Sequence, residues 1–154
     1  MNIFVKANKT YILLLSLLTL GLLSACSNPA PAATPPKEPL GPPDRVDVIY
    51  FYKGEDCPCQ EVVGQRIYAT LFMNFNEELA SSKLIFQSLN LDGKENATIA
   101  YKYGATPVSL FINIVRADNE HFIAVPEILL VQDDDEALDK LMNTRIRQVL
   151  DGEG

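Results

Sequence analysis

One short segment, Cys57-Pro58-Cys59, lies where an apolar stretch gives way to a helical pattern. Residues 46–52 before it are rich in β-branched and aromatic side chains, and only Asp47 interrupts them, which predicts a strand buried on both faces. Pro58 is a favourable first helical residue, and apolar residues recur about every four positions after it. A helix N-terminus stabilises a thiolate and the turn exposes it, so this junction indicates redox or soft-metal chemistry.

The N-terminus has the layout of a secretory signal. Lys6 and Lys9 precede an apolar run from Tyr11 to Leu23, and small residues follow up to Cys26. The run is short for a membrane span. Leu-Ser-Ala-Cys resembles the bacterial lipoprotein signal, which implies cleavage after residue 25 and lipidation (palmitate among the acyl groups) of Cys26. The alternative is an uncleaved anchor, and either reading places the domain at a membrane, outside the cytoplasm, in a bacterial cell envelope.

Charge limits the partners that this chain can bind. The 154 residues include 13 basic and 20 acidic side chains, for a net charge of −7. Removal of residues 1–25 deletes two lysines and no acid, so the net charge becomes −9. Such a surface disfavours nucleic acid and anionic lipid as partners. The membrane contact is therefore expected to come from the lipid on Cys26 and not from a basic patch.

A single domain is expected from residue 45 to residue 154. Residues 26–44 carry seven prolines, which predicts an extended, disordered tether between lipid and domain. The domain pattern predicts strands at 46–52, 84–91, 108–115 and 122–125, a long helix from 58 to about 81, and helices at 95–103 and from 133 to about 150. Alternating strands and helices followed by a hairpin and a helix predict an α/β fold, with a mixed sheet of about four strands between layers of helices.

These features resemble the thioredoxin superfamily. The residues that carry the resemblance are the strand leading into Cys57-Pro58-Cys59, the segments 89–92 and 100–104, and Thr106-Pro107 before the next strand. The resemblance implies a three-layer thioredoxin-like fold with a redox-active cysteine pair. It also implies a cis Pro107 beside the sulfurs, with Thr106 and Pro107 binding an extended substrate strand or a partner thiol.

The chain departs from the thioredoxin pattern at two places. One residue separates the cysteines where thioredoxins have two, and the strand position that often holds a buried acid is apolar, at Tyr50 or Phe51. More narrowly, the chain is similar to small, often lipid-anchored bacterial proteins filed as accessory subunits of nitroreductase or arsenic-resistance systems. No flavin motif is present in the sequence, and no cofactor is expected.

The spacing of the cysteine pair indicates how it reacts. Residues two apart on a helix diverge by about 200 degrees, so a bonded pair needs Cys57 in the turn and Cys59 in the first helical turn. So small a ring favours an easily reduced disulfide, and hence a disulfide donor or isomerase in thiol-disulfide exchange with a protein partner. By its place nearer the tip, Cys57 is expected to attack and Cys59 to resolve. The helix lowers a thiol pKa and nearby acids raise it, which leaves the net sign open.

Three alternatives stay open at this point. The pair could bind a soft metal or arsenite, form a purely structural bond, or belong to a non-catalytic binding module on the same fold. No third metal ligand lies near in sequence, and the only histidine, His121, is interpreted as an ordinary hairpin residue. Residues 96–98 have the form of a glycosylation acceptor but are interpreted as helix. The acids at 133–136 are interpreted as favouring a helix N-terminus, with no metal.

Overall fold

The computed structural model describes residues 41–54, 57–117 and 119–153. The predicted signal segment, Cys26 and the tether up to residue 40 lie outside the described residues. Along the chain the elements are β1 (Arg45–Tyr52), α2 (Pro58–Asn74), α3 (Asn76–Ala80), β2 (Leu84–Asn90), η1 (Lys94–Asn96), α4 (Ala97–Tyr103), β3 (Ser109–Arg116), β4 (Asn119–Ala124), α5 (Ile128–Val131) and α6 (Asp135–Leu150).

The four strands form one mixed sheet in the order β2-β1-β3-β4. β1 runs parallel to β2 and antiparallel to β3, and β3 and β4 form an antiparallel hairpin. Strand β1 is central, and its six residues from Val46 to Phe51 are all buried. The expected four-stranded mixed sheet and doubly buried first strand are confirmed.

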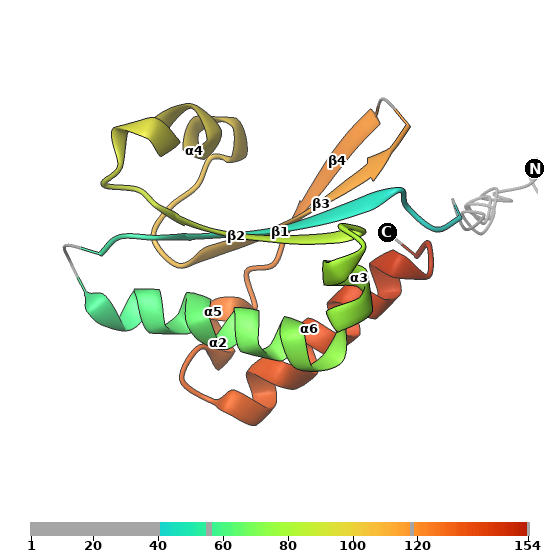
Figure 1. The fold of residues 1–154 in the computed structure, drawn as a ribbon. Coiled ribbons are helices and arrows are strands. Elements are labelled where there is room, and N and C mark those ends of the chain that lie inside the picture. Colours follow the sequence, from blue (N-terminus) through green and yellow to red (C-terminus); the bar gives the residue numbers. More distant parts are fainter. Residues whose placement is uncertain (1–40, 55–56, 118, 154) are drawn as a thin grey trace, which may run out of the picture. The chain divides into compact units, whose positions relative to one another are not determined.

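Helices cover both faces of this sheet (Figure 1). Alternate residues of a strand point to opposite faces, so β1 contributes to two cores. On one face Val48 and Tyr50 pack with Ile67 of α2 and Met142 of α6 in the larger core. On the other, a smaller aromatic core lies under α4; it consists of Ile49, Phe51, Tyr103 and Phe111. The three-layer α/β architecture predicted from the sequence is therefore present.

The long helix predicted from residue 58 to about 81 is interrupted at Phe75. This residue has φ −140° and ψ 36°, which are not helical values, and α3 begins immediately after it. The Phe75 side chain is buried in the larger core, and the Arg147 guanidinium lies 5.3 Å from its ring centroid. Packing against α6 therefore accounts for a break that the apolar repeat did not reveal.

Residues 41–44 already contact the sheet. The Asp44 carboxylate accepts a hydrogen bond from the backbone N–H of Ala117 at 2.6 Å, and the Asp44 N–H donates to the Val115 carbonyl at 2.9 Å. Pro43 is buried, and Arg116 donates to the Gly41 carbonyl at 3.3 Å. The folded part of the chain thus includes the last residues of the proline-rich segment.

The C-terminal part contains one helix that the sequence pattern did not predict, the single turn α5. Helix α6 begins as expected at an acid-rich segment, because the Asp134 carboxylate accepts a hydrogen bond from the Ala137 N–H at 3.0 Å. One side of the helix faces the core: Leu138, Met142, Ile146 and Val149 are buried, and Leu141 is half-buried. Among the described helices, none is long and apolar enough to cross a membrane.

Candidate functional site

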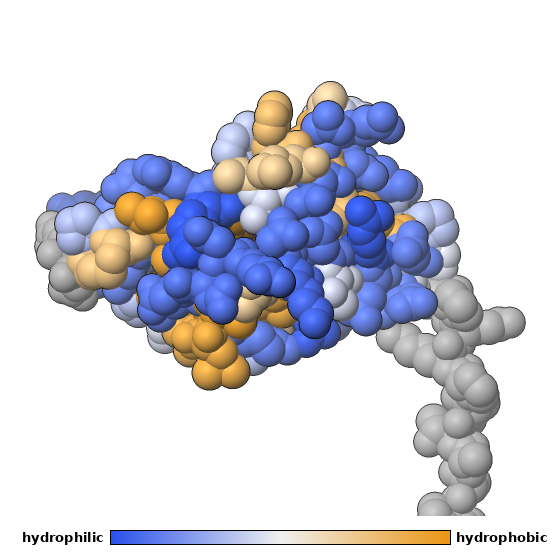
Figure 2. Space-filling view, turned by 90° about the horizontal axis from the view of Figure 1, so that it is seen from below, coloured by the Kyte–Doolittle hydropathy of each residue, from blue (hydrophilic) through white to orange (hydrophobic). Residues whose placement is uncertain are grey.

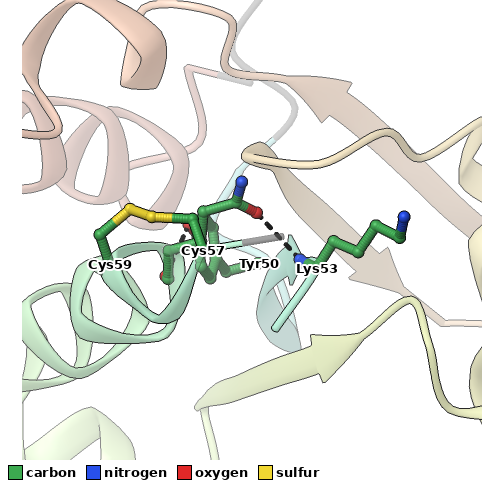
Figure 3. The surroundings of a disulfide bond; sticks show 5 residues. Tyr50, Lys53, Cys57 and Cys59 are labelled. Atoms are coloured by element: carbon green, nitrogen blue, oxygen red, sulfur yellow. Dashed lines mark hydrogen bonds between the residues drawn. A yellow bond between two sulfur atoms is a disulfide. The ribbon is translucent and has the colours of Figure 1, made fainter. Parts of the chain in front are cut away.

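Cys57 and Cys59 form a disulfide at the N-terminus of α2, with their Cα atoms 5.2 Å apart (Figure 3). This separation lies within the usual range of about 4.4–6.8 Å for bridged cysteines. The pair lies just beyond the end of β1, with Glu55 and Asp56 outside the described residues. The structure therefore brings together the two sulfurs that the sequence identified as the candidate site.

Backbone geometry around the pair is as predicted from its spacing. Cys57 is the N-cap of α2 and is extended, with φ −159° and ψ 112°, whereas Pro58 is the first helical residue. The Gln60 N–H donates to the Cys57 carbonyl at 3.0 Å and closes the first turn, which contains Cys59. Both sulfurs thus lie at the positive end of the helix dipole, where a thiolate is stabilised.

The exposure of the two cysteines differs from the expectation. Cys59 is exposed and Cys57 is half-buried, although the sequence-based assignment of roles assumed that Cys57 was the more accessible. The reason is that Cys57 precedes the helix and lies between the end of β1 and α2, whereas Cys59 projects from the first turn. In the disulfide form, Cys59 is therefore the residue that an incoming thiol reaches more readily.

Gln60 holds this junction in place, and sequence reasoning missed it. The Tyr50 hydroxyl donates to the Gln60 carbonyl at 2.9 Å, and the Lys53 N–H donates to the Gln60 side-chain carbonyl oxygen at 2.9 Å (Figure 3). One residue of the first turn of α2 is thereby tied both to β1 and to the loop after it. No sequence pattern marks a glutamine directly after a cysteine pair as the residue that ties the helix start to the strand and the loop.

Tyr50 occupies the strand region where thioredoxins often keep a buried acid. Its side chain is fully buried, and burial raises the pKa of Tyr50 to about 12, with a smaller contribution from Tyr52. The hydroxyl therefore stays protonated, and remains a hydrogen-bond donor, to a higher pH than an ordinary tyrosine. Tyr50 and Phe51, the two positions at which the sequence lacks this acid, both carry fully buried aromatic side chains.

A buried acid does exist on β1, but farther from the cysteines. Asp47 is only 6% exposed and accepts hydrogen bonds from Arg45 Nε at 2.7 Å and from Asn113 Nδ2 at 3.1 Å. Tyr52 lies five positions after Asp47 along the strand, at a distance of about 16 Å. Asp47 thus belongs to a structural polar cluster in the sheet and not to the surroundings of the disulfide.

Helix α2 approaches the sheet closely at Gly64, one turn beyond the cysteines. A Cβ atom at this position would lie 2.7 Å from Ser88 Oγ and 3.1 Å from the Tyr50 ring. A groove of about 380 Å³ lies beside this contact and is lined by Tyr52, Glu61, Gly64, Gln65, Tyr68, Phe86 and Ser88. The glycine therefore sets the depth at which the disulfide-bearing helix packs on β1 and β2.

Thr106 and Pro107 lie at the same end of the sheet as the cysteines. Ser109, the first residue of β3, is paired with Phe51 near the end of β1. The turn that precedes β3 therefore lies at the edge of the sheet where β1 ends and the chain continues to Cys57. Both Thr106 and Pro107 are exposed. A small cavity of about 150 Å³ adjoins this turn, and its walls include Thr106, Pro107 and Leu129.

The prediction of a cis peptide bond before Pro107 is wrong, because none of the described peptide bonds is cis. Residues 106–109 form a β-turn closed by the Ser109 N–H, which donates to the Thr106 carbonyl at 3.1 Å. Pro107 occupies the second position, and Val108 has φ 62°, in the left-handed region. The Ser109 hydroxyl also accepts from the Thr106 N–H at 3.0 Å. These contacts hold the turn, and β3 begins at Ser109 instead of Val108.

Metal ligands do not gather around the pair within the described residues, where no group of three or more His, Cys, Asp or Glu side chains could hold a metal ion. His121 lies on the edge strand β4, exposed and paired in register with Ile114. This position agrees with its interpretation as an ordinary hairpin residue.

Solved thioredoxin structures are similar to this chain, whereas family models and curated sequences are not. No protein-family model matches the chain, and no curated protein matches its sequence. Among solved structures, a thioredoxin from Thermus thermophilus is similar at 14% identity and a TM-score of 0.45, covering 68% of this chain and 76% of that one. The germline-specific thioredoxin Deadhead from Drosophila melanogaster is similar at 19% identity and a TM-score of 0.36, covering 66% and 81%. The described domain is an α/β fold with a mixed four-stranded sheet, helices on both faces and a cysteine pair at the start of α2, which is the architecture predicted from the sequence.

Proposed function

We propose that this chain is a membrane-anchored, extracytoplasmic thiol-disulfide exchange protein that donates or isomerises disulfides. The observation that carries the proposal is the disulfide between the N-cap and the first turn of α2, with Cys59 exposed. A purely structural bond across so short a loop would restrain the unfolded chain very little. An exposed disulfide at a helix N-terminus is suited to thiol-disulfide exchange, because a thiolate can reach it and the helix dipole stabilises the thiolate that leaves.

The exchange proceeds in two steps. A partner thiolate attacks Cys59 Sγ; the new sulfur–sulfur bond forms as the Cys57–Cys59 bond breaks, and Cys57 leaves as a thiolate. The N-terminus of α2 stabilises that leaving group. A second partner thiolate then attacks the partner sulfur of the mixed disulfide and releases Cys59. The partner loses two electrons and gains a disulfide, and its two protons pass through solvent to Cys57 and Cys59.

The partner would bind beside Thr106 and Pro107. Their exposure and their place at the cysteine end of the sheet support this part of the proposal. The signal pattern and Cys26 support the proposed lipid anchor on the outer side of a bacterial membrane. The similarity to lipid-anchored accessory proteins stays a prediction from the sequence.

Trapping of mixed disulfides tests the exchange. The full chain, with Cys26→Ser to leave only the candidate pair, is incubated with a reduced peptide that carries two cysteines, and the products are separated by mass. We expect the oxidised protein to convert the peptide to its disulfide, and Cys57→Ser to accumulate a mixed disulfide through Cys59 when the peptide is supplied oxidised. Reduced peptide that stays reduced with the oxidised protein, together with oxidised peptide that forms no adduct with Cys57→Ser, would contradict the proposal. A reduced pair that binds Cu(I) or arsenite in a one-to-one ratio and oxidises no peptide would favour the metal-binding alternative.

A further inference from the structure

One edge of the sheet, strand β2, is paired on a single side within the described residues. The Val46 N–H donates to the Lys83 carbonyl and the Leu91 N–H donates to the Tyr52 carbonyl, so the odd-numbered residues of this segment point their backbone groups toward β1. Successive residues alternate in direction. The N–H and C=O groups of Leu84, Phe86 and Ser88 therefore point outward, whereas the Asn90 carbonyl already accepts from Gly93 and Asn96.

The β2 edge lacks the sequence features that usually prevent an exposed edge strand from pairing with another chain. Exposed edges are usually protected by charged residues, proline or a bulge. The seven residues of β2, Leu84-Ile85-Phe86-Gln87-Ser88-Leu89-Asn90, include no charge, no proline and no glycine. A short uncharged segment of this kind pairs with another strand or aggregates.

Apolar side chains continue outward from the edge onto α2. Tyr68 is 48% exposed and Phe72 is 58% exposed, and the ring centroid of Tyr68 lies 5.8 Å from that of Phe86 and 6.2 Å from that of Phe72. Figure 2 shows that the face of the helices is otherwise mostly hydrophilic, with hydrophobic side chains in separate patches. The backbone edge and this aromatic patch of Tyr68, Phe72 and Phe86 adjoin each other.

We propose that β2 is a homodimer interface, in which a second copy of this chain pairs antiparallel with it about a two-fold axis at Phe86. Phe86 then faces Phe86 of the second copy, and Leu84 faces Ser88, so the three residues with outward backbone groups satisfy one another. The occupant is a second copy because the outward groups are self-complementary about Phe86. An uncharged edge also lets two acidic chains meet without like charges in contact. The two aromatic patches lie on the same side of the joined sheet.

Ser88→Pro tests this pairing without removing a bond to β1. The Ser88 N–H points outward, and proline is tolerated where a strand's N–H faces away from the sheet. The molecular mass of the full chain is measured in neutral detergent with free thiols blocked, so that no intermolecular disulfide contributes. We expect a dimer for the wild type and for the matched control Ser88→Ala, and a dimer dissociation constant raised by about tenfold or more for Ser88→Pro.

A second set of variants keeps the backbone intact and tests the register. In the proposed dimer Gln87 faces Ile85 of the second copy, so Gln87→Lys places two positive charges near the axis and Ile85→Glu places two negative ones. Each alone should weaken the dimer, and a mixture of the two variants should restore it. A wild-type chain that is monomeric, or a dimer that Ser88→Pro and Gln87→Lys both leave unchanged, would overturn the proposal. A monomer that pairs only with another protein's strand would overturn it as well.

Discussion

The Tyr50 hydroxyl donates a hydrogen bond of 2.9 Å to the Gln60 carbonyl and so joins the buried centre of β1 to the first turn of α2. The first-turn carbonyl is fixed by a side chain from the sheet, while the side chain of the same Gln60 fixes the loop before the cysteines. The disulfide is therefore carried by a helix start that is anchored on two sides.

Removal of that hydroxyl should loosen the helix start. Tyr50→Phe keeps the ring but removes the hydroxyl that donates to the Gln60 carbonyl, so we expect a loss of about 1 kcal/mol in the free energy of unfolding, measured with urea. Tyr101→Phe is the matched control, because Tyr101 is exposed and has no such bond. Equal unfolding curves for the two variants would contradict the anchoring role of Tyr50.

Tyr50 should also affect the alkaline limit of stability. Its pKa is raised from 10 to about 12, chiefly by burial, so the folded protein retains the Tyr50 proton longer than the unfolded chain does. This contribution is fully present below pH 10 and is lost as the pH rises to about 12. Titration of tyrosinate absorbance should reveal a late step near pH 12 that Tyr50→Phe removes. Burial also raises the pKa of Tyr103, so the test is the size of the late step, and a step near pH 12 that keeps its full amplitude in Tyr50→Phe would contradict the assignment.

The close contact at Gly64 predicts a cost for any added side chain. In Gly64→Ala the methyl group would meet Ser88 Oγ and the Tyr50 ring, so the serine hydroxyl must turn away and the buried ring or α2 must move by a few tenths of an ångström. We expect a destabilisation of about 1–3 kcal/mol despite alanine's better helix propensity. Combination with Ser88→Ala removes the nearer of the two contacts and should recover part of that loss. Thermal unfolding of the single and double variants measures both effects. An unchanged or higher melting temperature for Gly64→Ala would show that the helix does not need this approach.

Asp47 is expected to stabilise the sheet without taking part in exchange. Asp47→Ala leaves Arg45 and the buried Asn113 amide without their acceptor, which should cost about 2–4 kcal/mol. The milder Asp47→Asn should leave the pH profile of disulfide exchange unchanged, because the carboxylate is about 16 Å along the strand from Tyr52. A pH profile altered by Asp47→Asn would instead identify Asp47 as a proton-transfer group.

Local signals in the sequence were sufficient for much of the fold and the site. Residues 46–52 predicted a buried strand because their composition is almost wholly β-branched and aromatic, and Pro58 between two cysteines allowed only one bonded geometry. The acid-rich segment before α6 predicted its start through the capping role that Asp134 fills. In each case the information lies within a few neighbouring residues.

Features set by tertiary contacts were not predictable in this way. The break at Phe75 depends on packing against α6, and the apolar repeat runs through it without interruption. Val108 adopts a left-handed conformation that β-branched residues rarely take, and the turn formed with Thr106, Pro107 and Ser109 holds it there. No pattern in the sequence indicated this turn, and the cis proline expected at its place was wrong. The exposure of Cys59 over Cys57 likewise depends on how β1 meets α2.

The reduction potential of the Cys57–Cys59 pair tests the central claim most directly. The full chain with Cys26→Ser is equilibrated in glutathione buffers of graded potential, and the reduced fraction is read by thiol labelling. A disulfide donor or isomerase should be half-reduced between about −120 and −230 mV. A potential below about −300 mV, in the range of inert structural disulfides, would contradict the proposed exchange function.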